Sequence, residues 1–266
     1  MTDLDGTMMS HDDYSLEGIQ EVVSLLHEQN IPVVFNTSKT YAESRAIQQR
    51  LTINDPFIVE NGSCIYLPRD PYRPAPQDAG IRDDFCSVQL GYSQQHIVSI
   101  LDEMNLPGEY YTRLSQCTVE QAVALTGLTQ EQARQAIERE FSEPIIWHAG
   151  DEAKAAFIKD LGSHQLSTLQ GGRFLHILGA CDKGLAMQRL LACYEHKIST
   201  IVLGDSANDI DMLSLADVSV VVNSPANHYM ERRIDPVIKT IASAPAGWIE
   251  AINKALLQIS SYQEDT

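Results

Sequence analysis

The feature that most constrains the fold is a run of valines late in the chain, from Val218 to Val222, interrupted by Ser219 alone. Successive side chains of a strand point to opposite faces, so a run without polar alternation predicts a strand buried on both faces. Strands of this kind belong to parallel sheets, because the crossovers between parallel strands place helices over both faces. The run therefore predicts an α/β fold.

The rest of the sequence extends this prediction, because short apolar runs alternate with helical stripes near both ends of the chain. Alternating strands and helices are typical of an α/β sheet. The strands expected here are 31–35, 56–59, 63–67, 200–203 and 218–222, the third as a hairpin partner after the turn Glu60-Asn61-Gly62. The helices expected here begin with one capped by Ser15 that ends near Asn30, followed by 41–50, 183–192, 210–215 and 248–259.

The middle of the chain has a different pattern. The stretch 68–76 is rich in Pro, Arg and Asp and is typical of a linker. Beyond it we expect helices at 93–104, 119–125, 131–140 and 152–161, a strand at 145–147, and a hairpin of 166–169 and 173–178 around Gly171-Gly172. Thr129 and Gln132 form a capping-box pattern. This order predicts an α+β unit, 81–177, inserted into an α/β domain of 1–80 and 178–266.

Composition limits the classes of partner. The 266 residues include 19 Lys and Arg against 36 Asp and Glu, a net charge of −17. Nucleic acids need a basic footprint, so this balance argues against them, although it leaves room for a small anionic substrate. Five dispersed cysteines without a CxxC spacing indicate reduced thiols. No long apolar run or signal peptide is apparent, so we expect a cytoplasmic protein without membrane spans. The sequence does not indicate an oligomeric state.

The first candidate site is Asp3-Leu4-Asp5-Gly6-Thr7. Residues i and i+2 of an extended chain point to the same side, so Asp3 and Asp5 can face one site. One carboxylate can attack and hold a metal while the other moves a proton. Alone, the motif is weak evidence, because short acidic runs before Gly are usually surface turns.

Three later stretches strengthen this interpretation. Thr37 follows an expected strand and precedes a helix, where a hydroxyl and free N–H groups can hold phosphate. Lys183 lies at a helix start, where the helix dipole disfavours a positive charge. A functional reason for its position is that it neutralises a bound anion. The stretch 204–209, GDSAND, follows an apolar strand and offers oxygen ligands to Mg²⁺. Taken singly, each also has an ordinary explanation as a cap or a surface residue.

Together, in this order, the four stretches resemble the haloacid dehalogenase (HAD) superfamily of phosphohydrolases. The resemblance implies a Rossmann-like core with the middle block as an α+β cap. It implies that Asp3 is the nucleophile that forms an aspartyl-phosphate and Asp5 the general acid/base. It also implies that Thr37, Ser38 and Lys183 bind phosphate, and that Asp3, Asp5, Asp205 and Asp209 provide the Mg²⁺ site.

Shorter words resemble the mannosyl-3-phosphoglycerate phosphatases within that superfamily. They are 38–40 (SKT), 60–62 (ENG), 126–129 (TGLT), 172–176 (GRFLH) and 245–248 (PAGW). This resemblance implies hydrolysis of mannosyl-3-phosphoglycerate to mannosylglycerate, a compatible solute. It also implies substrate binding by Lys39, Asn61 and Arg173, with the Arg173 guanidinium suited to the glycerate carboxylate.

Other functions remain open from the residues. One is a related HAD sugar phosphatase acting on glucosyl-3-phosphoglycerate, sucrose phosphate or hexose phosphates. Others are a phosphomutase and a non-catalytic sugar-phosphate-binding relative. A further expectation concerns the start of the chain, because Met1 and Thr2 alone precede Asp3. We expect Asp3 to end a central strand between 31–35 and 200–203, and we expect that first strand to be truncated.

Overall fold

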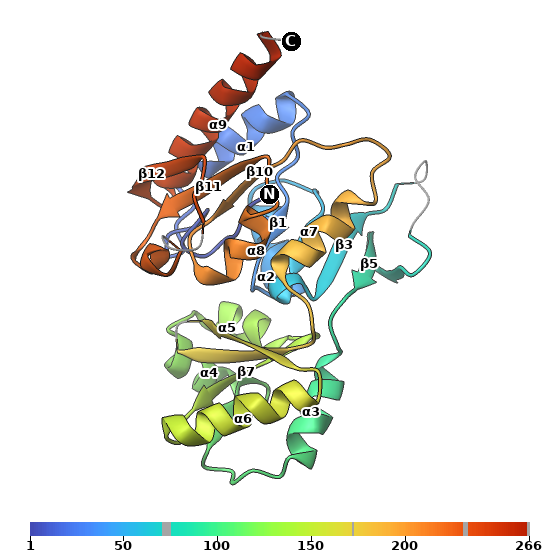
Figure 1. Cartoon of the computed structure of the whole chain (residues 1–266), viewed down its shortest axis with the longest axis vertical. Helices are drawn as coiled ribbons and strands as arrows, with labels where there is room; N and C mark the ends of the chain where they lie inside the picture. The colour runs from blue at the N-terminus through green and yellow to red at the C-terminus, as the bar shows by residue number, and fades with distance from the viewer. Residues whose placement is uncertain (71–75, 172, 231–233, 265–266) are drawn as a thin grey trace.

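The computed structural model describes residues 1–70, 76–171, 173–230 and 234–264. Figure 1 shows two parts: a larger one that contains the N-terminus and α9, and a smaller one below it. We call them the core unit and the cap unit, the latter comprising residues 92–179. The arrangement confirms the predicted α/β core with an inserted α+β unit.

One mixed sheet organises the core unit. Its strands are β1 (Phe35–Asn36), β2 (Phe57–Val59), β3 (Cys64–Pro68), β4 (Gly80–Arg82), β5 (Phe85–Gln89), β10 (Ile201–Gly204), β11 (Val218–Asn223) and β12 (Ile238–Ser243). They run in the order β1-β2-β3-β5-β4 on one side and β10-β11-β12 on the other. Thr2 joins the two sides through parallel bridges to Phe35 and Leu203. Asp3 therefore comes directly after the central position of the sheet, between β1 and β10, as predicted.

Helices cover both faces of this sheet. On one face lie α1 (Ile19–Glu28), α2 (Tyr41–Arg50) and α9 (Ala246–Glu264), and on the other lie α7 (Lys183–Leu191) and α8 (Ile210–Leu213). Val220 and Val222 pack in the same cluster as Trp248 of α9, whereas Val221 packs with Met212 of α8. The valine run is thus a strand buried on both faces, as its composition predicts.

The cap unit is a second, antiparallel sheet with helices. Its strands are β6 (Tyr111–Arg113), β7 (Ser142–Trp147), β8 (Ser167–Gly171) and β9 (Phe174–Leu178), in the order β6-β7-β9-β8. Its helices are α3 (Gln94–Glu103), α4 (Val119–Thr126), α5 (Gln130–Ile137) and α6 (Asp151–Ser163). Leu175 and Ile177 of β9 pack against α3 and α6, and Phe174 packs against α4 and α5. The predicted capping box of Thr129 and Gln132 is present.

Short 3-10 turns complete the structure: η1 (Glu60–Gly62), η2 (Leu114–Gln116), η3 (Ala207–Asp209) and η4 (Pro225–Tyr229). The two connections between the units lie side by side near η1. The Gly91 N–H donates to the Ser63 carbonyl at 2.9 Å, and the Cys181 sulfur lies 3.3 Å from the Ser63 hydroxyl. A Cβ on Gly179 would lie 2.8 Å from the Tyr92 nitrogen, so the outgoing and returning segments touch.

Several expected boundaries were wrong. Ser15 does not cap α1, because its hydroxyl accepts the Glu17 N–H in a turn and the helix starts after left-handed Gly18. The strand expected at 31–35 is paired at Phe35 and Asn36, the positions that find partners on β2. The helix expected at 131–140 ends at Ile137, because the residues that follow contact the core unit.

The stretch 68–76 does not separate the two units. Pro68 ends β3, and β4 and β5 return beside β3 in the core sheet, so the chain leaves the core unit after β5. Residues 71–75 lie outside the described part. We therefore propose 92–179 as the inserted unit in place of 81–177. The hairpin of β8 and β9 forms as expected, although Gly172 is not among the described residues.

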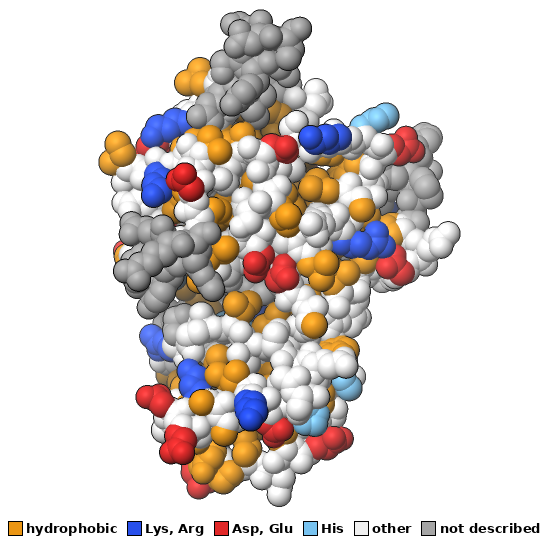
Figure 2. All heavy atoms as spheres, in the orientation of Figure 1, with side chains coloured by type: hydrophobic (Ala, Val, Ile, Leu, Met, Phe, Trp, Pro, Cys, Tyr) orange, Lys and Arg blue, Asp and Glu red, His pale blue; other side chains and the backbone are white. Residues whose placement is uncertain are grey.

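Within the described residues, no helix is both long and apolar enough to cross a membrane. On the face shown in Figure 2, the Lys and Arg side chains are scattered among Asp and Glu side chains over both units. A surface of this kind differs from the continuous basic footprint that nucleic acid backbones need.

Candidate active site

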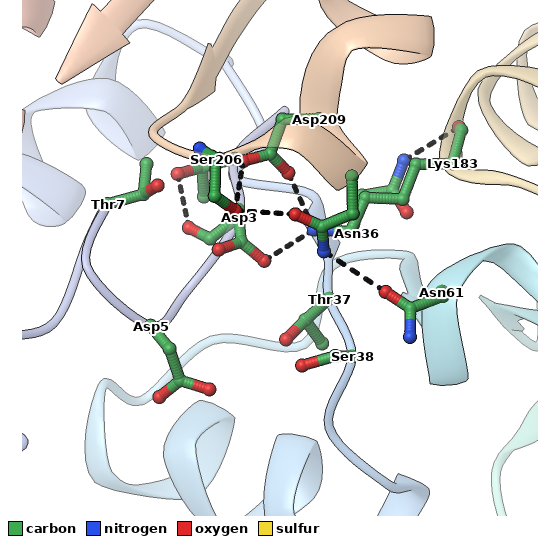
Figure 3. Close-up of polar contacts among 12 residues, drawn as sticks. Asp3, Asp5, Thr7, Asn36, Thr37, Ser38, Asn61, Lys183, Ser206 and Asp209 are labelled. Atoms are coloured by element: carbon green, nitrogen blue, oxygen red, sulfur yellow. Dashed lines mark hydrogen bonds and ion pairs between the residues drawn. The ribbon is translucent and has the colours of Figure 1, made fainter. Parts of the chain in front are cut away.

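The candidate site lies where parallel strands end. Asp3 follows Thr2, Thr37 follows β1, Asp205 follows β10 and Ser224 follows β11. The carboxyl ends of parallel strands share one edge of the sheet, which is where open α/β sheets bind ligands. Figure 3 shows Asp3, Lys183, Ser206 and Asp209 converging at this edge.

A buried ion-paired group lies at the centre of the site. The Lys183 Nζ donates to Asp3 Oδ1 at 2.6 Å and to Asp209 Oδ1 at 2.7 Å. The side chains of Lys183 and Asp209 are 0% exposed, and that of Asp3 is 7% exposed. Burial of a lysine is costly unless it is paired, so these contacts account for its position at the start of α7. The predicted phosphate ligand Lys183 and nucleophile Asp3 are thus in direct contact.

Asp205 completes the group from the neighbouring loop. Its Oδ1 accepts the Thr7 hydroxyl at 2.9 Å, and its Oδ2 accepts the Ser224 hydroxyl at 2.7 Å. Its backbone N–H donates to Asp209 Oδ2 at 2.9 Å. These bonds fix the Asp205 carboxylate beside Asp3, because each of its oxygens is held from a different loop.

The charges of this group fit a divalent cation. One carboxylate oxygen from each of Asp3, Asp205 and Asp209 lies within 4.8 Å of the others. Burial, foremost, and repulsion by Asp209 and Asp205 raise the pKa of Asp3. Burial and Asp209 raise the pKa of Asp205 to about 6. Lys183 alone does not neutralise three carboxylates, and oxygen donors of this kind suit Mg²⁺, so the residues present fit the predicted ion.

Lys183 itself remains positively charged. Burial acts to lower the pKa of Lys183, but Asp209 and Asp3 outweigh that effect and raise it. The lysine therefore stays protonated and keeps a positive charge beside the position where a phosphate would enter.

Asp5 lies apart from the three clustered carboxylates. Figure 3 shows its side chain on the other side of the opening from Asp209. The Lys39 Nζ pairs with Asp5 Oδ1 at 2.9 Å and lies 3.6 Å from Glu43 of α2. The structure therefore does not bring the Asp5 carboxylate into the group of Asp3, Asp205 and Asp209 that could hold a metal ion. Asp5 is instead the ion-pair partner of Lys39.

Thr37 and Ser38 line the opening between Asp3 and Asp5. In Figure 3 their hydroxyls point toward this opening. The Thr37 carbonyl accepts the Asn61 N–H at 2.9 Å, and the Thr37 hydroxyl accepts the Lys39 N–H at 3.2 Å. The Asn61 side-chain oxygen accepts an N–H of Asn208 at 3.2 Å, so Asn61 joins two loops of the site.

The turn η1 also connects the site to the cap unit. The buried Glu60 carboxylate accepts the N–H groups of Glu140 at 2.9 Å and Phe141 at 3.2 Å, and the Ser142 hydroxyl at 2.6 Å. In the opposite direction, Arg139 donates to the Ser38 carbonyl at 3.0 Å. We call this group of six residues the clamp.

Arg173 belongs to the cap unit. It is exposed at the β8–β9 hairpin, and its guanidinium donates to the Leu125 carbonyl within the cap unit. Burial raises the pKa of Tyr14 in the core unit, and the charge of Arg173 acts against that rise. Arg173 is thus electrostatically close to the core unit but is not among the residues that contact the clustered carboxylates.

Sequence reasoning assigned no role to Thr7, Ser224, Glu60 or Arg139. A signal existed for three of them. Thr7 belongs to the first motif, and Ser224 follows the valine strand. Polar residues after parallel strands are candidates by position. Glu60 carried the same signal, because it directly follows β2, a parallel strand. Arg139 carried no such signal, because its contact depends on where the cap unit packs.

Comparison with known proteins places this geometry in a family. Residues 1–240 match the haloacid dehalogenase-like hydrolases. Two curated relatives bear the name glucosyl-3-phosphoglycerate/mannosyl-3-phosphoglycerate phosphatase. The one from Methanococcoides burtonii is 34% identical over 94% of each chain, and the one from Persephonella marina is 33% identical over 97% of each.

Solved structures agree on the fold. The sucrose-phosphatase of Synechocystis, determined with sucrose and phosphate, superposes with a TM-score of 0.63 at 18% identity and covers 95% of both chains. At this identity the likeness concerns the fold. The family match, the full-length relatives and the grouping of four motif loops at one sheet edge agree with one another, and the chain belongs to the haloacid dehalogenase-like hydrolases.

Proposed function

We propose that this hydrolase is a phosphatase that removes the phosphate from mannosyl-3-phosphoglycerate and releases mannosylglycerate. The observation that carries the proposal is the buried group in which Lys183 joins Asp3 to Asp209 beside Asp205. Phosphoryl transfer depends on positioning and on charge neutralisation. It therefore needs a nucleophilic carboxylate, a fixed cation and a group of carboxylates that can hold a metal ion. The names of the two curated relatives support the substrate class.

In the first step, an oxygen of Asp3 attacks phosphorus and the bond from phosphorus to the ester oxygen breaks. The leaving alkoxide takes a proton from Asp5. Lys183 donates to Asp3 in the structure and, in this proposal, also to a phosphoryl oxygen. The hydroxyls of Thr37 and Ser38 bind the remaining phosphoryl oxygens. Asp5 must leave its ion pair with Lys39 to reach the ester oxygen.

In the second step, water attacks phosphorus of the aspartyl-phosphate and the bond to the Asp3 oxygen breaks. Asp5, now a carboxylate, takes the proton of the water. Phosphate leaves, and both carboxyl groups return to their starting states. The same residue thus acts first as acid and then as base.

Asp3, Asp205 and Asp209 are the residues that would hold Mg²⁺, with Thr7 and Ser224 orienting Asp205. When bound, the ion supplies positive charge that offsets the charge of the phosphate and of the carboxylates.

Glucosyl-3-phosphoglycerate is a second candidate substrate, because the names of both relatives include it. A phosphate-release screen tests the proposal. We expect the highest kcat/KM for mannosyl- or glucosyl-3-phosphoglycerate, and a much lower value for glucose 6-phosphate and sucrose phosphate. Equal rates on all four would indicate a general sugar phosphatase. A requirement for a sugar bisphosphate would indicate a mutase, and failure to release phosphate from any of them would indicate a binding protein.

A further inference from the structure

Among the described residues of the cap unit, three buried side-chain nitrogens have no hydrogen-bond partner. Trp147 Nε1 belongs to a ring that stacks on Phe157 of α6, and the other two are Arg139 Nε and His176 Nδ1. The Arg139 side chain is 8% exposed. Buried polar atoms are rarely left unsatisfied, because losing water without gaining a partner costs about 1–3 kcal/mol per group. The two atoms therefore indicate that a polar partner enters this region.

Both residues belong to the side of the cap sheet that faces the core unit. His176 lies on β9 between Leu175 and Ile177, which pack against α3 and α6, so its ring points to the opposite face. Arg139 follows α5, and its Nη1 reaches the Ser38 carbonyl of the core unit at 3.0 Å. Arg139 thus contacts the loop of Thr37 and Ser38 from the cap side, and His176 lies near enough for the charge of Arg139 to act on it.

The contacts of Arg139 leave its binding edge open. Nη1 donates to Ser38 and to the Ser142 hydroxyl at 3.1 Å. A carboxylate binds a guanidinium bidentately through a pair of parallel N–H groups, and the Nε edge is one that the observed contacts do not use. Glu60 lies 3.9 Å from Nη1 and already accepts three donors, so it does not take this edge.

The neutral state of His176 suits the same partner. Burial, foremost, and the charge of Arg139 lower the pKa of His176 to about 3. A neutral imidazole carries one N–H, which can donate to an acceptor that Arg139 also binds. The pair therefore combines one cation with a neutral donor.

We propose that Arg139 and His176 bind the carboxylate of the leaving group, a 2-substituted glycerate. The inference rests on the proposed function, in which the substrate is a phosphoglycerate. Two carbons separate the carboxylate carbon from the ester oxygen of such a substrate, so the carboxylate must lie close to the phosphate loop. Arg139 meets this requirement through Ser38, whereas Arg173 is exposed and bonded to Leu125. Arg139 and His176 thereby select for a carboxylate-bearing leaving group.

The test uses two inhibitors that differ in the carboxylate, 3-phosphoglycerate and glycerol 3-phosphate. Their inhibition constants are measured in excess Mg²⁺ for the unaltered protein, Arg139→Lys, His176→Phe and Ser142→Ala. Lysine keeps the positive charge but lacks the paired N–H groups of the guanidinium. The histidine variant removes a side chain with an unpaired Nδ1, so it leaves the clamp intact. Ser142→Ala is the control for the clamp, since it removes the hydroxyl that joins Glu60 to Arg139 Nη1 but keeps both nitrogens and the contact of Arg139 with Ser38.

We expect the unaltered protein to bind 3-phosphoglycerate at least about tenfold more tightly than glycerol 3-phosphate, the range of one charge-assisted hydrogen bond. Arg139→Lys and His176→Phe should each reduce that ratio severalfold, while Ser142→Ala leaves the ratio unchanged. A ratio that persists in both variants of a folded protein that cleaves glycosyl-phosphoglycerates overturns the inference alone. If the unaltered protein does not cleave those substrates, the proposed function itself is wrong.

Discussion

At the scale of single residues, Lys183 decides what the site can hold. Its Nζ lies within 2.7 Å of both Asp3 and Asp209, so one cation offsets part of the charge of three neighbouring carboxylates. Removal of one member of a buried charge group leaves the others uncompensated, at a cost of about 3–5 kcal/mol. Variants that keep the shape of a side chain are therefore the informative ones.

Asp3→Asn is the first such variant. The amide has nearly the same shape but is a poor nucleophile, so we expect phosphate release to fall at least about a thousandfold, or about 4 kcal/mol of barrier. The melting temperature should show a retained fold. Asp12→Asn is the control, because Asp12 is an exposed acid in the same region. Substantial turnover by a pure Asp3→Asn sample would contradict the role of Asp3.

Thr7→Val and Ser224→Ala test the metal site through its outer contacts. Each removes one hydroxyl that orients Asp205, and loss of such contacts lowers metal affinity about 10–100-fold in other proteins. We expect activity to vanish with EDTA, to return with Mg²⁺, and to need more Mg²⁺ in both variants. Ser214→Ala is the control, since that hydroxyl donates to the Ile210 carbonyl within α8 and its loop. Unchanged Mg²⁺ titrations would argue against Asp205 as a ligand.

At the scale of elements, the turn η1 joins three parts of the site. Asn61 contacts Thr37 and Asn208, Glu60 contacts the cap unit, and Gly62 packs beneath the start of α7. Glu60, Asn61 and Gly62 all have positive φ angles, of 48°, 59° and 94°. Consecutive residues in this region are strained unless their surroundings hold them, which agrees with a functional role for the turn.

Gly62→Ala is the variant that tests this turn. An added Cβ would lie 2.1 Å from the Asp182 carbonyl oxygen, and the left-handed conformation costs a non-glycine residue about 1–2 kcal/mol besides. We expect a loss of more than about 2 kcal/mol in urea unfolding, with reduced activity because Asp182 precedes Lys183. At Gly162 of α6 a Cβ meets nothing within 4 Å, so Gly162→Ala should not destabilise the protein. Equal unfolding of both variants would refute the packing argument.

The sequence allowed prediction of elements with strong local signals. Thr129 with Gln132, and Ser93 before α3, identify helix starts through side chains that bond within the same turn. β4 was not predicted, because Gly80 and Ile81 are exposed and the strand is defined by its partner β5. Pairing of this kind depends on distant residues, and the inserted unit was therefore expected to begin before β5.

The candidate site divides in the same way. The structure brings together Asp3, Lys183, Asp205 and Asp209 as the motifs predicted, because each follows a parallel strand or starts a helix at one sheet edge. The contact of Arg139 with Ser38 was not predictable, because it depends on how the cap unit packs on the core unit. Arg173 is exposed, and Arg139 is the arginine whose side chain is buried against Ser38.

At the scale of the whole molecule, the clamp sets the position of the cap unit over the site. Glu60→Ala would leave the N–H groups of Glu140 and Phe141 without their acceptor, which costs about 1–3 kcal/mol for each buried group. We expect faster amide exchange at Glu140 and Phe141 and a lower kcat/KM. Glu131→Ala, at a largely exposed position of α5, is the control. Unchanged amide exchange in Glu60→Ala would show that other contacts hold the cap unit in place.

The contact between the outgoing and returning connections has a consequence for modularity. Gly91 and Gly179 touch above Ser63, so the two ends of the inserted unit are already adjacent. If 92–179 is removed, a short Gly-Ser linker is therefore enough to connect residue 91 to residue 180. We expect the shortened chain to fold, as measured by circular dichroism. Because Thr37, Ser38 and the group of Asp3, Lys183, Asp205 and Asp209 remain in the shortened chain, it would serve as a platform on which foreign cap units can be grafted to change the leaving group.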